Sequence, residues 1–447
     1  MLRSRLPHPL HAGPRGILVG LLAAACGGAE LAAPENAYLA RAPKPSAGPT
    51  VELADPSFGH RGDVALVVRI IGTGYAPGAR ASWELDGGTA KITVHSTEFV
   101  SSTELQATIS IAADADLAFY NVAVTSGGKK GIGTYKFEVT QAIAIEGARL
   151  ARGVNDAGQV TGVGSYYWSA ETGLEALAGG GSGWDLSDDG QTVVGGQGGG
   201  NPTGTVPLVW TRNGAAWAQS TLPITTSAGN ARAVASDAAG VGVLIAGVET
   251  YALKGRDYRR EPRLWIRAGS GWVRTALPGL GATTEGQLSD AVIGGVAVGN
   301  SSGRASVWTP VAGGGWSVAA IGPSGSDALA INRTGTLIVG NSGGSATYWS
   351  WNGAGWVGPV PLVGACAAAV GVAGDGRIIA NGCARPDVGI TSVIIQAPYG
   401  PGDVRYLSGF GDRLDGPQAE AISPNGQWIV GRAVLRGSVV GAYWNLF

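Results

Sequence analysis

The chain has 447 residues, a net charge of −1, only 14% charged residues and 76 glycines. So little charge excludes the basic stripe that a nucleic-acid-binding surface needs, so we expect no nucleic-acid partner. The 45% of hydrophobic residues exclude an intrinsically disordered chain, and the length predicts more than one folded core.

Residues 1–25 have the pattern of an export signal. Three arginines precede an apolar stretch over residues 16–22, and small residues follow it. This stretch is too short for a membrane-spanning helix. The sequence therefore predicts a signal peptide.

A cysteine follows the signal directly. Ala23-Ala24-Ala25-Cys26-Gly27-Gly28 resembles the lipobox of bacterial lipoproteins, although Ala23 stands where that family prefers Leu. The resemblance implies that Cys26 is lipidated and anchors the protein in the bacterial envelope, at the outer membrane or outside the cell. The alternative is ordinary signal cleavage with Cys26 incidental. Residues 26–49 are rich in Ala, Pro and Gly and predict a flexible tether, so the membrane is contacted through the lipid alone.

Residues 50–140 predict an antiparallel sandwich, because short apolar runs alternate with Gly and Pro turns. The run 64–71 leads into Gly72-Thr73-Gly74-Tyr75, and the run 120–125 reads Tyr-Asn-Val-Ala-Val-Thr. These residues resemble the immunoglobulin-like IPT/TIG family. The resemblance implies a spacer or binding module with no catalytic role.

Residues 141–447 repeat one pattern seven times: an apolar run, a Gly-bearing turn, a second apolar run ending in Gly, and a strand that carries Trp. Four short runs in each unit predict a seven-bladed β-propeller, with a solenoid of stacked hairpins as the alternative. The overall expectation is an all-β protein, an immunoglobulin-like sandwich followed by this propeller. Ile395 replaces the Trp of the sixth unit, and the other units carry Trp168, Trp210, Trp265, Trp308, Trp349 and Trp444.

The last unit ends before a fourth strand, and residues 141–145 precede the first unit as a spare apolar run. Because an open ring would leave two bare edges, we predict that these residues supply the missing strand. The repeated tryptophans are expected to pack between neighbouring units rather than to bind sugars.

The repeat resembles the bacterial extracellular HAF repeat in its turn, its Val-x-Gly run and its aromatic-Trp strand, over residues 146–447. The His-Ala-Phe triplet of that family is missing, since the third strands read Tyr166-Tyr167-Trp168 or Tyr443-Trp444. The resemblance implies a surface location and a β-repeat fold, and it implies no activity.

Cys366 and Cys383 lie at equal distances from the turn at Gly374-Asp375. Opposed positions of a hairpin bring Cβ atoms close enough for a disulfide, and an oxidising compartment permits the bond. A metal pair or a catalytic cysteine is the alternative, but no histidine of the repeat region could assist either.

The four histidines are His8, His11, His60 and His95, so the repeats contain none. This removes Ser-His-Asp triads and His-ligated zinc from the propeller and leaves only paired carboxylates. The recurring turn residues Asp156, Asp188, Asp189, Asp237 and Asp375 predict capped turns rather than calcium ligands, because no dense Asp-x-Asp run occurs. We predict no catalytic residue, no metal and no cofactor.

One insertion, in the third unit, breaks the low-charge pattern. Tyr251, Arg256, Tyr258, Arg259 and Arg260 are the candidate ligand-binding residues, because inserted loops of repeat proteins often form the binding face. Tyr and Arg also recur as interface anchors. The alternative is a solvated hairpin extension.

The sequence thus predicts a non-catalytic binding or scaffold protein of the cell surface, whose propeller loops recognise a surface protein or a glycan. One alternative is a propeller lyase or glycosidase that uses paired carboxylates. Another is an assembly component held by strand addition at the edge of the sandwich.

Overall fold

The computed structural model is almost entirely β, which confirms the predicted all-β class. Within the described residues the only helical segment is the 3-10 turn η1 (Pro401–Asp403). No helix among those residues has the length and apolar character to cross a bilayer. Cys26, the expected signal and residues 26–47 of the expected tether lie outside the described residues. The described residues are 48–86, 90–198, 205–226, 228–253, 258–281, 285–292, 295–385, 389–411 and 416–446.

The first two sheets are formed by residues 50–140 and share one apolar core. One sheet has the order β1 (Thr50–Asp55), β3 (Leu66–Thr73), β6 (Glu104–Ile111), β5 (Ile92–Ser101). The other has the order β2 (Phe58–His60), β8 (Lys129–Thr140), β7 (Phe119–Ser126), β4 (Arg80–Glu84). Strand β6 shows the reason for this pairing, since every second residue is buried, as a strand with one face on a core requires.

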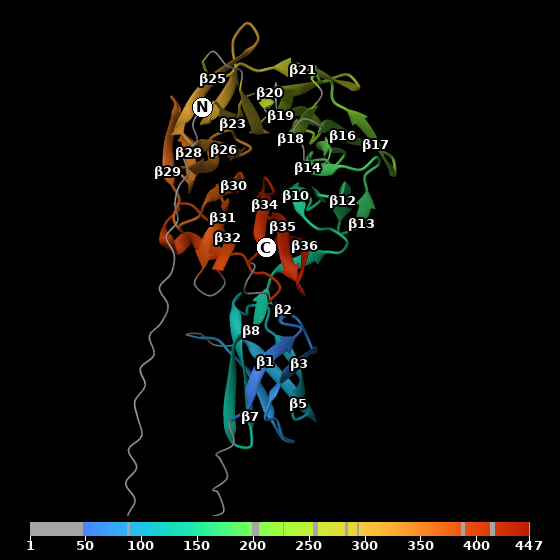
Figure 1. Ribbon diagram of the computed structural model, residues 1–447, viewed down its shortest axis with the longest axis vertical. Helices are drawn as coiled ribbons and strands as arrows, with labels where there is room; N and C mark the ends of the chain where they lie inside the picture. Colours follow the sequence, from blue (N-terminus) through green and yellow to red (C-terminus); the bar gives the residue numbers. More distant parts are fainter. Residues whose placement is uncertain are drawn as a thin grey trace, which may run out of the picture. The chain divides into compact units, whose positions relative to one another are not determined.

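Seven further four-stranded sheets follow, one for each sequence repeat, and Figure 1 shows them placed around a common centre. Six of them run in chain order. Their strands are β10 (Ala151–Val154), β11 (Val160–Gly162), β12 (Tyr166–Ser169), β13 (Gly173–Ala176); β14 (Ser182–Leu186), β15 (Thr192–Gln197), β16 (Val206–Asn213), β17 (Ala216–Thr221); β18 (Ala228–Ser236), β19 (Gly242–Ala252), β20 (Tyr258–Ala268), β21 (Gly271–Ala276); β22 (Gly286–Ala291), β23 (Ala297–Ser301), β24 (Arg304–Pro310), β25 (Trp316–Ser324); β26 (Ser326–Ile331), β27 (Leu337–Ser342), β28 (Ser345–Trp351), β29 (Trp356–Pro361); and β30 (Ala368–Val372), β31 (Ile378–Arg385), β32 (Gly389–Ile395), β33 (Val404–Tyr406).

The seventh sheet joins two distant parts of the chain. It has the order β34 (Gln418–Ile422), β35 (Trp428–Leu435), β36 (Ser438–Asn445), β9 (Ala142–Ile145). Strand β9 runs antiparallel to β36, with Ile145 opposite Gly441 and Ala142 opposite Trp444. The prediction that residues 141–145 supply the missing strand is confirmed.

The first strands of consecutive sheets contact one another from β10 to β34, and β34 contacts β10 again. Seven apolar clusters fill the spaces between the sheets, and each contains residues of two consecutive sheets. One of them places Val430 of the last sheet beside Val160 of the first. The hydrophobic core of this region therefore lies between the sheets.

The repeated tryptophans lie in these clusters, which confirms that they pack between neighbouring sheets. Five of the indoles are at most 1% exposed, and Trp168 is half-buried against Tyr443. In four cases the indole N–H donates a hydrogen bond to a carbonyl two residues beyond the fourth strand of the preceding sheet. These pairs are Trp210 with Ala178, Trp265 with Pro223, Trp308 with Pro278 and Trp444 with Ser408, at 2.7–2.8 Å.

A disulfide joins Cys366 and Cys383. Both cysteines belong to the apolar cluster between the fifth and sixth sheets. This is the interface in which Ile395 replaces the tryptophan, so a covalent bond and an aliphatic side chain occupy the place of the indole. By the chain-entropy estimate the bond stabilises the fold by about 3 kcal/mol.

Strand β8 passes into β9 with one residue between them. At this junction the buried carboxylate of Glu138 accepts hydrogen bonds from the backbone N–H groups of Gly409 and Gly411, at 2.9 and 2.8 Å. The Phe58 and Phe410 rings also pack together, with centroids 5.3 Å apart. The loop that links the sixth and seventh sheets is therefore held by β8 and β2.

Candidate functional site

Each of the seven first strands contains a β-bulge near its middle. A bulge interrupts the alternation of side chains and re-aims the extra residue. In this fold all seven extra residues line one central cavity. In sheet order these residues, which we call the bulge ring, are Arg152, Trp184, Arg232, Ser289, Leu329, Val370 and Glu420.

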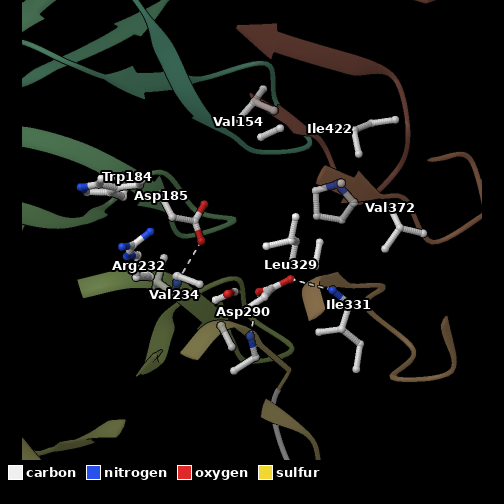
Figure 2. Close-up of a pocket in the computed structure, with 18 of the residues that line it drawn as sticks. Val154, Trp184, Asp185, Arg232, Val234, Asp290, Leu329, Ile331, Val372 and Ile422 are labelled. Atoms are coloured by element: carbon white, nitrogen blue, oxygen red, sulfur yellow. Dashed lines mark hydrogen bonds between the residues drawn. The ribbon is translucent and has the colours of Figure 1, made fainter. Parts of the chain in front are cut away.

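The cavity has a volume of about 430 Å³, which falls in the range of small-molecule sites. Its two sides differ in chemistry. Figure 2 shows Trp184, Asp185 and Arg232 on one side and the aliphatic Val372 and Ile422 on the other. A ligand with a polar and an apolar part would therefore be bound in one orientation.

Trp184 holds two arginines of the neighbouring sheets. The guanidinium carbon of Arg152 lies 3.6 Å from the centroid of the indole ring, and that of Arg232 lies 4.6 Å from it. Both cations therefore make cation–π contacts with a single aromatic side chain. This fixes the two guanidinium groups at the cavity wall.

The arginines of this group repel one another. Burial, together with the positive charges of Arg260 and Arg152, lowers the pKa of Arg232 to about 10. Burial also lowers the pKa of Arg152, and the Glu420 carboxylate opposes that shift. In turn, burial raises the pKa of Glu420 against the attraction of Arg152 and Arg432. This wall of the cavity thus carries an excess of buried positive charge.

Two aspartates also line the cavity, one residue after the bulges of the second and fourth sheets. Each uses both carboxylate oxygens. Asp185 accepts the N–H of Leu186 and, from the next sheet, that of Val234, both at 2.9 Å. Asp290 accepts the N–H of Ala291 at 2.7 Å and, from the next sheet, that of Ile331 at 2.9 Å. Figure 2 shows the bonds to Val234 and Ile331. These carboxylates connect the backbones of adjacent sheets.

The two aspartates should make stability depend on pH. Burial raises the pKa of Asp185 from its ordinary 3.8 to about 7, with a smaller contribution from Asp290, and raises the pKa of Asp290 to about 6. Below pH 3.8 both states of the protein hold these protons, whereas near neutral pH the folded state must bury the charges. The free energy of unfolding should therefore fall as pH rises from about 4 to 7.

Asp185→Asn should remove most of this pH dependence, because the Asp185 carboxyl changes the free energy of unfolding by an amount on the order of 3 kcal/mol over this pH range. Any hydrogen bond lost in the variant should lower stability by the same amount at every pH. Urea unfolding of the wild type and the variant at pH 5 and pH 8 checks the prediction. An equal drop between the two pH values in both proteins would contradict it.

An ion pair crosses one end of the cavity. Arg333, in the first turn of the fifth sheet, pairs with Asp156 of the first sheet at 3.2 Å and with Asp188 of the second. These two aspartates were predicted to cap turns, but they bind the arginine of a distant repeat. The prediction of capping is confirmed at Asp189, Asp237 and Asp375, whose carboxylates accept backbone N–H groups of their own turns.

The insertion of the third unit lengthens β19 and β20. Thr250 and Arg260 lie in register with Ala228, the first residue of β18. The insertion therefore lies at the end of β18 that is opposite the first turn, which follows Ser236. Arg259 lies over the ring of Tyr251 and pairs with Glu261 at 2.6 Å. The predicted binding residues Tyr251 and Arg259 thus contact each other.

Arg260 is the predicted binding residue that acts on the bulge ring. It lies over the Tyr258 ring, donates to Gln287 at 3.4 Å, and its charge reaches Arg232. Arg256 lies outside the described residues. Of the predicted binding residues, Arg260 is therefore the one whose charge acts on a residue of the cavity wall, although it does not line the cavity itself.

Arg152, Trp184 and Arg232 are not among the binding residues that the sequence predicts. One signal for this position exists, because Arg152 and Trp184 each stand three residues before the first turn residue of their units, Asn155 and Ser187. Among the described residues no group of three or more His, Cys, Asp or Glu side chains could hold a metal ion. The chain matches no protein-family model, and no curated protein is significantly similar to it.

Proposed function

We propose that this protein is an exported, lipid-anchored binding protein of the bacterial surface, and that its seven repeat sheets form a seven-bladed β-propeller which binds a glycan in its central cavity. The cyclic contacts of the first strands and the completion of the last sheet by β9 support the propeller. The two-sheet arrangement of residues 50–140 supports an immunoglobulin-like sandwich of the IPT/TIG kind. The signal and the Cys26 anchor rest on the sequence alone.

The observation that carries the binding function is the bulge ring. Seven different strands each turn one side chain into the same cavity, and the resulting walls are chemically different. A cavity of about 430 Å³ suits a sugar-sized group better than a protein surface, which needs a flatter and larger area. We therefore favour a glycan over a surface protein as the partner.

The alternative, a lyase or glycosidase, would use Asp185 and Asp290 as its paired carboxylates. Burial gives Asp185 a pKa near that of a general acid. Both oxygens of each carboxylate are nevertheless engaged by backbone N–H groups, in part from the neighbouring sheet. A catalytic carboxylate needs an oxygen that reaches the substrate, so we favour binding over hydrolysis.

A glycan array followed by calorimetry tests the proposal with a variant that fills the cavity. Leu329→Trp places an indole in the bulge ring and should weaken binding of an array hit at least tenfold. Val357→Trp is the matched control, since Val357 lies on the outer strand of the same sheet and is 47% exposed. Equal affinity of the two variants would reject the cavity as the site, and release of cleaved sugar would favour the enzyme.

A further inference from the structure

Two arginines of the bulge ring have polar atoms without a partner. The Nε atoms of Arg152 and Arg232 are buried, and no described residue accepts a hydrogen bond from either. Neither guanidinium forms an ion pair with any carboxylate in the described part of the chain. A buried hydrogen-bond donor without an acceptor destabilises a protein. Two such donors in one cavity wall therefore indicate that a bound ligand supplies the acceptors.

The surrounding charges do not supply that acceptor. Asp185 and Asp290 each already accept two backbone N–H groups, and no ion pair joins Glu420 to Arg152 among the described residues. Arg260 adds a third guanidinium near Arg232 and increases the repulsion. The pair of Arg152 and Arg232 on Trp184 therefore lacks a compensating negative charge among the described residues.

We propose that Arg152 and Arg232 bind an oxyanion of the ligand, a carboxylate, sulfate or phosphate carried by a sugar-sized molecule. This inference rests on the proposed function, because it assigns the chemistry of the ligand to the same cavity. The guanidinium group presents a planar fork of donors that matches such oxyanions. Trp184 holds both forks in place before the ligand arrives, which reduces the entropy lost on binding.

The position of this pair agrees with an acidic sugar. The anion would lie on the cationic side, and the ring of the same sugar would extend toward Leu329 and Val370 on the aliphatic side. Arg333 and its two aspartates cross one end of the cavity.

Calorimetry of the full protein at constant ionic strength tests the proposal with defined probes. These are glucuronate, the uncharged methyl ester of glucuronic acid, sulfate and phosphate. The ester keeps the ring and replaces the carboxylate with an uncharged ester that carries one added methyl group, so the pair tests the contribution of the negative charge. Comparison of glucuronate with the inorganic anions distinguishes an acidic sugar from any small oxyanion.

The test variant is Arg152→Gln combined with Arg232→Gln. The control combines Arg80→Gln with Arg149→Gln, which removes the same charge at exposed positions. The test variant should melt no lower than the wild type without anion, because it removes buried charges that repel each other. It should bind glucuronate at least tenfold more weakly than the wild type, and the control should bind as the wild type does.

The outcomes separate this inference from the proposed function. Binding of glucuronate and its ester with equal affinity would overturn the inference and leave the cavity as a site for neutral sugars. Equal anion binding by the test and control variants would also overturn it, since the anions would then lie elsewhere. If no anion binds at millimolar concentration while Leu329→Trp weakens a neutral glycan, the inference fails and the proposed function stands.

Discussion

Trp265→Ala is expected to lower the free energy of unfolding by about 3–5 kcal/mol. The indole is fully buried and lies in an apolar cluster with Val194 and Val209 of the second sheet and Ile245 of the third. Its removal leaves a cavity between two sheets and also deprives the Pro223 carbonyl of its 2.8 Å hydrogen bond. Urea unfolding followed by circular dichroism measures the change.

Trp351→Ala provides the control for this measurement. Trp351 ends strand β28, is 43% exposed and contacts only the edge of Trp356 among aromatic rings of the described residues. Its truncation should cost no more than about 1 kcal/mol. A similar loss for both variants would show that the repeated tryptophans do not stabilise the interfaces between sheets.

Ile145→Asp is expected to destabilise the protein by about 4 kcal/mol or more. Ile145 is 1% exposed in strand β9 and packs between the last and the first repeat sheets. A carboxylate at this place would be buried with no cation to compensate it. The melting temperature and the urea midpoint of the variant should both fall sharply.

The same substitution two residues earlier in β9 is the matched control. Ile143 is 39% exposed, although it belongs to the same strand. Ile143→Asp should therefore have a small effect. If the two variants melt alike, β9 does not hold the first and last sheets together.

The sequence predicted the features of the fold that recur in every repeat. Each unit needs a glycine in its turn, a buried apolar strand and one large side chain that packs against the neighbouring sheet. These features therefore recur in every unit and can be aligned. The spare run at residues 141–145 and the opposed Cys366 and Cys383 followed from completing that pattern. Ile395, the one departure among the repeated tryptophans, lies at the interface that contains the disulfide.

The cavity was not predictable in the same way. Its residues share a backbone position but no chemical type, since the bulge ring contains Arg, Trp, Ser, Leu, Val and Glu. A β-bulge is set by the hydrogen bonds between two strands, and a composition pattern does not report these. The pairing of Arg333 with Asp156 and Asp188 joins turns of three separate repeats, so it depends on a tertiary contact that no local pattern encodes.

The pairing of β9 with β36 also determines the order of events during synthesis. Ile145 and its partner Gly441 are separated by about 300 residues of chain. At about 5–20 residues per second, the ribosome needs on the order of 15–60 s to make the second strand after the first. During that interval β9 lacks its partner strand β36. The last sheet is therefore assembled only after translation has passed residue 441.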